Sequence, residues 1–303
     1  MAHPAGTSAR LAGKGNAAEI TSRENRWLKR FRTALAGERG DDGTVGMEGV
    51  RLVEAALGSR LAVEALLVSE SGARHLPRVA PVLASDVPVF RTSDKLFASV
   101  ADTQTPQGIA ALVRPRLATI ENLMAGTPLV VALVGVQDPG NVGTIVRAGE
   151  AFGATGAVTC PADRIGTADP FGPKALRASA GSALRLPIVV GLSPTILLAQ
   201  LRIFRVKVYA AVAAALAEDS EIKTSDASSS LLCPWDIDWK KPAAILIGSE
   251  GSGLPVDLVR AADARVYIPQ AAATAPVGIE SLNAAMAASV LLYEAMRQRN
   301  AAH

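Results

Sequence analysis

The sequence is poor in the side chains that hold metals and cross-link secreted proteins. Among 303 residues there are only two cysteines, Cys160 and Cys233. Two cysteines form neither a disulfide framework nor a CxxC metal knuckle. The three histidines, His3, His75 and His303, lie at the termini or in a polar loop. We therefore expect no metal site and no histidine-based catalysis.

Long apolar runs are missing as well. No stretch reaches the roughly 18 uninterrupted apolar residues of a membrane span, and residues 1–18 lack the apolar core of a signal peptide. We interpret residues 1–18 as a flexible leader and the chain as cytoplasmic, with no membrane partner. A hydrophobic share of 49% and a length of 303 residues fit a globular protein of two domains.

Positive charge is concentrated in the first half. Residues 1–127 carry 16 Lys and Arg against 13 Asp and Glu, whereas residues 128–303 carry 15 of each, so the net charge of +3 belongs to the first half. Residues 20–32 hold five basic residues against the single Glu24. That density suits an RNA phosphate backbone, although a solvated helix face is the alternative. The candidate RNA-binding residues are Arg23, Arg26, Lys29, Arg30 and Arg32.

The first half alternates helical and extended patterns. Apolar residues recur at helical spacing over 27–35, and Thr21 or Ser22 before them suits a helix N-cap. Further segments predict helix 49–59, strand 63–70, strand 87–92, helix 93–102 and strand 108–115. We expect a small α/β domain over 19–117, followed by a linker over 118–128 that ends in Gly126 and Pro128.

The second half, 129–303, contains continuous apolar runs of the kind found in strands buried on both faces of a parallel sheet. The predicted strands are 129–136, 156–160, 208–212, 243–248 and 264–268, and the predicted helices are 142–152, 173–183, 194–204 and 280–299. This alternation favours a doubly wound α/β domain. The polar stretch 217–241 is expected to be a surface insertion.

Three loops after predicted strands carry polar residues that suit a ligand site. In GVQDPGNVGTIVRAGEAFGA (135–154), Pro139, Gly140 and Gly143 let the backbone approach a ligand, while Asn141 and Arg147 supply polar groups. A Rossmann dinucleotide site is the rival interpretation, but neither GxGxxG nor GxxxxGK[ST] is present.

The second loop is ILIGSEGSGLP (245–255), in which glycines surround Glu250. In the third, ESLN opens a long helix, and Ser281 and Asn283 are candidates either for a site or merely for a helix N-cap. All three loops lie beyond the carboxyl ends of apolar strands, where open α/β sheets bind ligands.

In this order the three segments resemble the three motifs of the SpoU/TrmH branch of the SPOUT RNA methyltransferases. FGPKALRASAGSALRLP (171–187) resembles the family's intervening segment. In the first half, ITSRENRWLKRFR, MEGVRLVEAAL and TPQGIAALV resemble the family's L30e-like substrate-binding domain. The resemblance runs from about residue 19 to residue 299.

The resemblance implies an RNA ribose 2'-O-methyltransferase that uses S-adenosylmethionine, with a deep trefoil knot in a carboxy-terminal SPOUT domain. It implies a homodimer and a donor adenine held by Gly248, Ile268 and Leu282. One departure is the lengthened link over 270–279, which puts the local wall of the donor site in doubt.

Arg147 stands at the family's catalytic position, which is often described as a general base. A guanidinium stays protonated at neutral pH, so we expect Arg147 to grip a phosphate and to stabilise charge on the reacting oxygen. Asn141 and Ser281 would orient ribose and phosphate, while Glu250 and Asn283 would support the pocket.

The additional L30e-like domain in the first half resembles the arrangement in ribosomal RNA members of the family. It therefore suggests 23S ribosomal RNA as the substrate, with transfer RNA as the alternative. A non-catalytic RNA-binding protein would be expected to lose Arg147 or Asn141, and a nucleotide-dependent oxidoreductase would need the missing GxGxxG.

Overall fold

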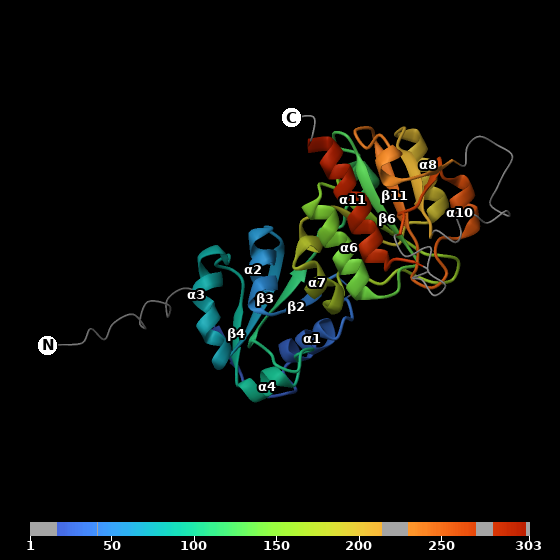
Figure 1. Ribbon diagram of the computed structural model, residues 1–303. Coiled ribbons are helices and arrows are strands. Elements are labelled where there is room, and N and C mark those ends of the chain that lie inside the picture. Colours follow the sequence, from blue (N-terminus) through green and yellow to red (C-terminus); the bar gives the residue numbers. More distant parts are fainter. Residues whose placement is uncertain (1–16, 41, 214–229, 271–280, 301–303) are drawn as a thin grey trace. The chain divides into compact units, whose positions relative to one another are not determined.

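The computed structural model describes residues 17–40, 42–213, 230–270 and 281–300, and it divides into two units (Figure 1). The first unit ends at Pro115 and the second begins at Arg116. The border expected after residue 117 therefore lies two residues earlier. None of the described helices combines the length and the apolar character that crossing a membrane requires.

The first unit is built on a five-stranded sheet in the order β1-β4-β3-β5-β2. β5 pairs antiparallel with both β2 and β3, whereas β4 pairs parallel with β1 and β3. The strands are β1 (Ala17–Ile20), β2 (Val45–Glu48), β3 (Ala62–Ser69), β4 (Val89–Thr92) and β5 (Ile109–Arg114).

The helices α1 and α4 cover one face of this sheet. Phe31 of α1 and Phe97 of α4 are buried in one apolar cluster with Leu67 of β3. Figure 1 shows both helices beside the strands. The helices are α1 (Arg26–Leu35), α2 (Val50–Gly58), α3 (Leu76–Val79) and α4 (Asp94–Ala98), with short 3-10 turns η1 (Ser71–His75) and η2 (Ala80–Val82).

The start of the first unit differs from the expectation in two places. The N-cap of α1 is Asn25, whose side chain accepts a hydrogen bond from the Trp27 amide at 2.9 Å, and not Thr21 or Ser22. Those two residues lie in the turn after β1. β1 begins at Ala17, inside the expected leader 1–18, because its backbone pairs with β4. A four-residue strand with the sequence AAEI has no distinctive alternation of apolar and polar residues.

The second unit is built on a seven-stranded sheet in the order β10-β12-β9-β11-β6-β7-β8, and every pair is parallel. The five long strands follow the five predicted runs. The strands are β6 (Leu129–Val134), β7 (Gly156–Cys160), β8 (Ile188–Val189), β9 (Lys207–Ala211), β10 (Leu231–Leu232), β11 (Ala243–Ile247) and β12 (Ala264–Val266).

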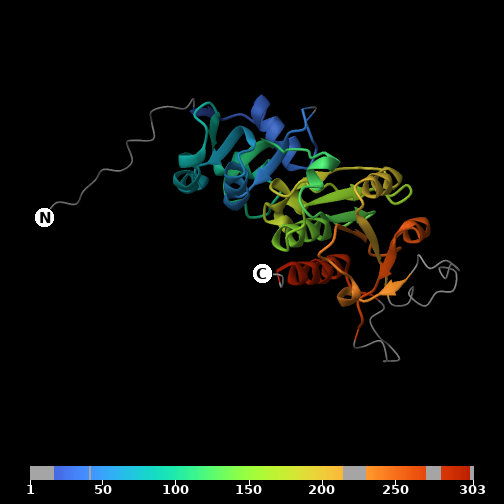
Figure 2. The ribbon, with the colours of Figure 1, turned by 90° about the horizontal axis from the view of Figure 1, so that it is seen from above.

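Helices pack on both faces of this parallel sheet, as predicted. On one face, Leu201 of α8 and Val259 of α10 are buried together with Val130 of β6. On the other face α11 packs against β11 and against α6, beside which it runs in Figure 2. The helices are α5 (Ile120–Leu123), α6 (Pro139–Ala151), α7 (Pro173–Ser179), α8 (Pro194–Ile203), α10 (Val256–Ala261) and α11 (Ala284–Asn300), with 3-10 turns η3 (Ser182–Leu184) and η5 (Pro234–Asp236).

Two segments expected to lie outside the core each contribute a described residue to it. The expected linker, 118–128, contains α5, whose Leu123 is fully buried against the sheet. The expected insertion, 217–241, is described from Ser230 onward, and there Trp239 is fully buried against Tyr209 with ring centroids 5.2 Å apart. In each segment one large apolar residue, Leu123 or Trp239, lies beside polar residues in the sequence, so the sequence pattern did not indicate that it is buried. The expected knot remains a prediction, since residues 214–229 and 271–280 lie outside the described chain.

Candidate active site

The three polar loops meet at the carboxyl edge of the parallel sheet. They follow β6, β11 and β12, which are all parallel and therefore end at the same edge. A cavity of about 380 Å3 opens there, formed by the ends of β9, β11 and β12 and by the first turns of α11. The fold thus brings together segments more than a hundred residues apart in the sequence.

The cavity contains the residues expected to hold a methyl donor. Gly248, Ile268 and Leu282 all line it, and so do Glu250 and Ser281. Its deeper wall includes apolar side chains from β11, β12 and α11, namely Ile247, Val266 and Leu291. An apolar wall with a few polar groups suits a nucleoside-sized ligand.

Gly248 is required by its own loop. A Cβ at this position would lie 2.2 Å from the carbonyl carbon of Gly253, so no side chain fits without moving the backbone. The loop is closed by two backbone hydrogen bonds of 3.1 Å between Ser249 and Gly253. Glycine at position 248 is therefore required by the packing of its own loop, in addition to the expected close approach of a ligand.

The first loop enters α6 at Asp138. The Asp138 carboxylate accepts a hydrogen bond from the Gly140 amide at 3.0 Å and an ion pair from Lys174 at 2.6 Å, and the latter holds the pKa of this carboxyl below its usual range. Gly143 does not face a ligand. A Cβ there would lie 2.3 Å from the Ala175 carbonyl oxygen, so this glycine lets α6 and α7 pack closely.

Asn141, Glu250 and Asn283 are joined by hydrogen bonds. Asn283 donates through Nδ2 to Asn141 Oδ1 at 3.1 Å, and Asn141 donates through Nδ2 to Glu250 Oε1 at 2.5 Å. Asn283 is also the cap of α11, because its Oδ1 accepts from the amides of Ala285 and Met286. The cap interpretation of Asn283 is confirmed, and the same side chain contacts Asn141, the candidate residue of the first loop.

Arg147 lies on α6, and its side chain is exposed. It makes no hydrogen bond or ion pair with any residue that the structure describes. Asn141 is engaged by Glu250 and Asn283 instead, so the expected return of Arg147 toward Asn141 is not seen. A spacing of six residues places the two side chains about a third of a turn apart on a helix. Arg147 thus presents its charge to solvent.

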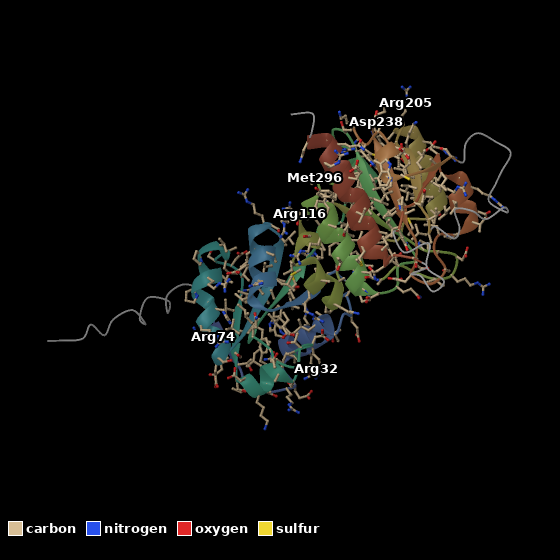
Figure 3. All side chains as sticks on the ribbon, in the orientation of Figure 1. Arg32, Arg74, Arg116, Arg205, Asp238 and Met296 are labelled. Atoms are coloured by element: carbon tan, nitrogen blue, oxygen red, sulfur yellow. The ribbon has the colours of Figure 1, made fainter. Side chains whose placement is uncertain are left out.

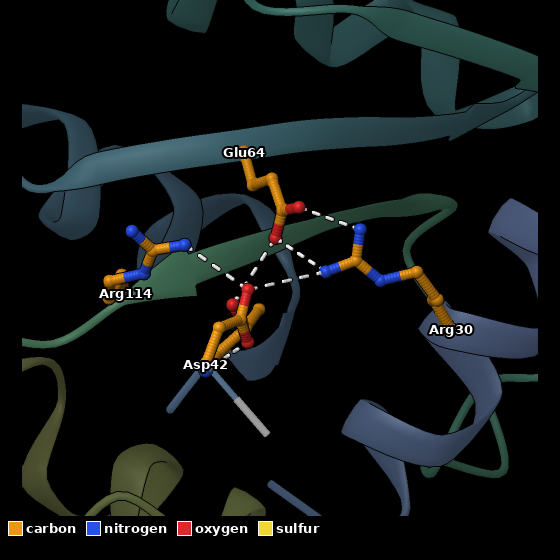
Figure 4. Close-up of polar contacts among 5 residues, drawn as sticks. Arg30, Asp42, Glu64 and Arg114 are labelled. Carbon is orange, nitrogen blue, oxygen red and sulfur yellow. Dashed lines mark hydrogen bonds and ion pairs between the residues drawn. The ribbon is translucent and has the colours of Figure 1, made fainter. Parts of the chain in front are cut away.

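The basic residues of α1, together with Arg23 just before it, divide into two groups. Lys29 is paired with Glu24 at 2.5 Å, and Arg30 makes two hydrogen bonds to Glu64, of 2.6 and 2.8 Å. Figure 4 shows that Arg30 also faces Asp42, which Arg114 contacts from the other side. By contrast Arg23, Arg26 and Arg32 are exposed and form no ion pair with a described residue; Arg32 is labelled in Figure 3.

Sequence reasoning missed Asp138 and Lys174, which hold the first turn of α6. The signal was present in an aspartate directly before Pro139, the pattern of a helix N-cap followed by proline at the first helical position. Lys174 lies 36 residues away, and only the packing of α7 on α6 brings it there. Ser281 lines the cavity and is exposed, while the lengthened link 270–279 falls almost entirely outside the described residues.

A parallel α/β domain with a ligand cavity at two of its polar loops and a third loop hydrogen-bonded to them, preceded by a separate basic unit, is the arrangement of a two-domain RNA-modifying enzyme. Residues 128–293 match the SpoU rRNA Methylase family, and residues 30–111 match the MRM3-like substrate binding domain. The chain belongs to the SpoU rRNA methylase family.

Relatives in two bacteria cover nearly the whole chain. The 23S rRNA guanosine 2'-O-methyltransferase RlmP of Bacillus subtilis is 31% identical over 91% of this chain and 98% of its own. A 23S rRNA uridine 2'-O-methyltransferase of Streptomyces viridochromogenes is 30% identical over 93% of both chains. The AdoMet-bound rRNA methyltransferase of Sinorhizobium meliloti is 28% identical, with a TM-score of 0.72 over 93% of this chain and 98% of its own.

Proposed function

We infer that this protein transfers a methyl group from S-adenosylmethionine to a ribose 2'-hydroxyl of ribosomal RNA. The observation that carries this function is the contact among all three family motifs: Asn141 of the first motif is hydrogen-bonded to Glu250 and Asn283, beside a cavity that the second and third motifs line. Relatives that cover more than nine tenths of the chain are named as 23S rRNA 2'-O-methyltransferases. We propose 23S rRNA as the substrate, and the cytoplasm as the place of reaction because the substrate is ribosomal.

The cavity residues fit the methyl donor. Gly248, Ile268 and Leu282 would hold its adenine through backbone groups and apolar contact, and a cavity of about 380 Å3 is within the usual range of ligand sites. When bound, the sulfonium supplies an electrophilic methyl group. Among the described residues there is no cluster of side chains that would hold a metal ion.

In this proposal Arg147 acts through its positive charge and does not abstract the proton of the ribose hydroxyl. Its guanidinium is exposed and has no ion pair with a described residue, so it is available to an RNA phosphate. A protonated guanidinium also stabilises negative charge that develops on the ribose oxygen. Asn141 and Ser281 would orient the ribose and its phosphate.

The basic residues of α1, together with Arg23 just before it, would bind the RNA backbone outside the reaction centre. Arg23, Arg26 and Arg32 are the strongest candidates, because none of them forms an ion pair with a described carboxylate. Lys29 and Arg30 belong to the same predicted surface, but their partners Glu24 and Glu64 reduce their contribution. The first unit would thus supply affinity and the second unit chemistry.

We further propose that the protein is a homodimer. Met286, Val290 and Tyr293 lie on one face of α11 at helical spacing and are 60%, 41% and 51% exposed. An exposed apolar stripe of this kind marks an interaction surface. Val290→Lys should convert the dimer to a monomer in sedimentation measurements, and an unchanged sedimentation coefficient contradicts this interface.

The function is tested by mapping 2'-O-methyl positions in ribosomal and transfer RNA from cells with and without the protein. We expect one position in 23S rRNA to lose its methyl group when the gene is deleted. Loss of a transfer RNA position instead would favour the alternative substrate, and no loss at all would favour a non-catalytic RNA-binding protein. Stabilisation by S-adenosylhomocysteine and not by NADH distinguishes the donor site from a dinucleotide site.

A further inference from the structure

The hydrogen bonds through Asn283, Asn141 and Glu250 run in one direction. A backbone N–H group can only donate, so the Asn283 atom that faces the N–H groups of Ala285 and Met286 must be its oxygen. The Asn283 nitrogen is then left to donate to Asn141 Oδ1. The Asn141 nitrogen in turn faces Glu250.

At Glu250, the last residue in this series of hydrogen bonds, the same direction is required. An ionised carboxylate can only accept, so Glu250 fits the nitrogen of Asn141 and not its oxygen. A flipped Asn141 amide would face nitrogen with nitrogen at Asn283 and oxygen with oxygen at Glu250. The first turn of α11 therefore fixes which atom of Asn141 points to Glu250.

We propose that Glu250 accepts a hydrogen bond from the target ribose hydroxyl, and that Asn283 is the positioning residue that holds it in this role. Glu250 Oε1 is taken by Asn141, whereas Oε2 has no hydrogen bond with a described residue, and Glu250 lines the same cavity as Ser281. An acceptor at this point orients the hydroxyl. This role rests on the proposed function and requires an acceptor atom, not a base.

A reversal of the hydrogen bonds tests this direction. In Glu250→Gln the introduced amide must use its oxygen to accept from Asn141, so its nitrogen faces the target hydroxyl. The hydroxyl can then only accept at this point, and its oxygen lone pair is turned toward the glutamine and away from the methyl donor. In Asn283→Asp the carboxylate still caps α11 but cannot donate. Asn141 then turns its nitrogen toward position 283, and its oxygen faces the Glu250 carboxylate.

Combining the two substitutions restores a complete set of hydrogen bonds in the opposite direction. The introduced aspartate accepts from the Asn141 nitrogen, and the Asn141 oxygen accepts from the nitrogen of the introduced glutamine. The glutamine oxygen is then left to accept from the hydroxyl. Each single substitution alone should lower the rate of methyl transfer. The double variant should recover part of that loss.

The experiment compares the wild type, the two single variants and the double variant. The substrate is ribosomal RNA from cells that lack the protein, and methyl transfer from labelled S-adenosylmethionine is measured in single turnovers. Thermal unfolding and S-adenosylhomocysteine binding are measured in parallel. The matched control is Glu121→Gln with Asn122→Asp, on α5 at the opposite edge of the sheet, which exchanges the same groups and should change neither activity nor binding.

We expect each single variant to lose at least about tenfold in rate, the effect of one mispaired polar group, and the double variant to be faster than either. A double variant no faster than the slower single variant overturns the proposal, because the carboxylate charge itself is then required. A Glu250→Gln rate equal to that of the wild type overturns it too.

A wild type that methylates no ribosomal RNA contradicts the proposed function instead. The direction of the hydrogen bonds is then decided by unfolding, in which the double variant should be more stable than Asn283→Asp alone. Additive free energies of unfolding overturn the direction whether or not the protein is active.

Discussion

The two units use their polar side chains in different ways. In the first unit two arginines are held by carboxylates: Arg30 lies between Glu64 and Asp42, and Arg78 makes two hydrogen bonds to Glu54. In the second unit Arg147 of α6 and Ser281 at the cavity make no hydrogen bond with a described residue. The paired arginines of the first unit connect its helices to one another and to the sheet, whereas the unpaired groups of the second unit remain available to ligands. The pairing state of a side chain is therefore a better guide to its function than its charge.

The comparison is tested most strongly by Arg147→Ala. We expect methyl transfer to fall by two orders of magnitude or more, about 3 kcal/mol of transition-state stabilisation, because the proposed role of Arg147 is to stabilise negative charge on the ribose oxygen. Unfolding and S-adenosylhomocysteine binding should be unchanged. Arg205→Ala, an exposed arginine between α8 and β9, is the control (Figure 3). A rate within about threefold of the wild type in single turnovers would show that Arg147 has no catalytic role.

The second largest effect is expected at Gly248. In Gly248→Val the new side chain meets the backbone of Gly253 and Leu254 before it meets any ligand, so the loop over 249–253 must move. We expect S-adenosylhomocysteine binding to weaken by at least about tenfold, a cost of more than about 1.4 kcal/mol. Gly251→Ala in the same loop is the control, since its Cβ would have no atom within 4 Å.

Circular dichroism must show that Gly248→Val is folded before calorimetry is interpreted. Normal affinity for S-adenosylhomocysteine in a folded variant would mean that the donor does not contact this loop. Equal losses in Gly248→Val and Gly251→Ala would mean that the loop tolerates no side chain anywhere.

The sequence predicted much of the second unit because its central strands β6 and β11 are runs of apolar residues that are buried along their whole length. It did not predict β8 and β10, which are two residues each, because pairing with a neighbour and not side-chain pattern defines them. The site residues were recognisable from the motifs around Asn141, Glu250 and Asn283. Their hydrogen-bond direction was not, since it depends on where α11 begins in space. Nor does sequence distinguish Arg26 from Arg30, whose partner Glu64 lies 34 residues away.

A smaller effect is expected when Arg26 and Arg30 are compared. For Arg26→Ala we expect the slope of log RNA affinity against log salt to become shallower by about 0.7 to 0.9, the value for one lost phosphate contact. Arg30→Ala should change the slope less, because Glu64 already neutralises that arginine. Both variants are measured on one ribosomal RNA fragment. Equal changes in slope would mean that RNA displaces the carboxylates and that pairing does not divide the basic helix.

The smallest effect concerns the paired charges themselves. Hydrogen bonds from Thr44, followed by the contact with Arg114, lower the pKa of Asp42 from 3.8 to about 2. A carboxyl whose folded pKa is depressed stabilises the fold above the unfolded pKa, and this stabilisation is lost as pH falls from about 4 to about 2. Because Asp42 is largely exposed, we expect less than about 1 kcal/mol. Asp42→Asn should therefore be slightly less stable than the wild type at pH 6, and the difference should shrink toward pH 2. A difference that stays constant over this range would mean that Asp42 acts through the shape of its turn, and that the paired charges of the first unit contribute nothing by their ionisation.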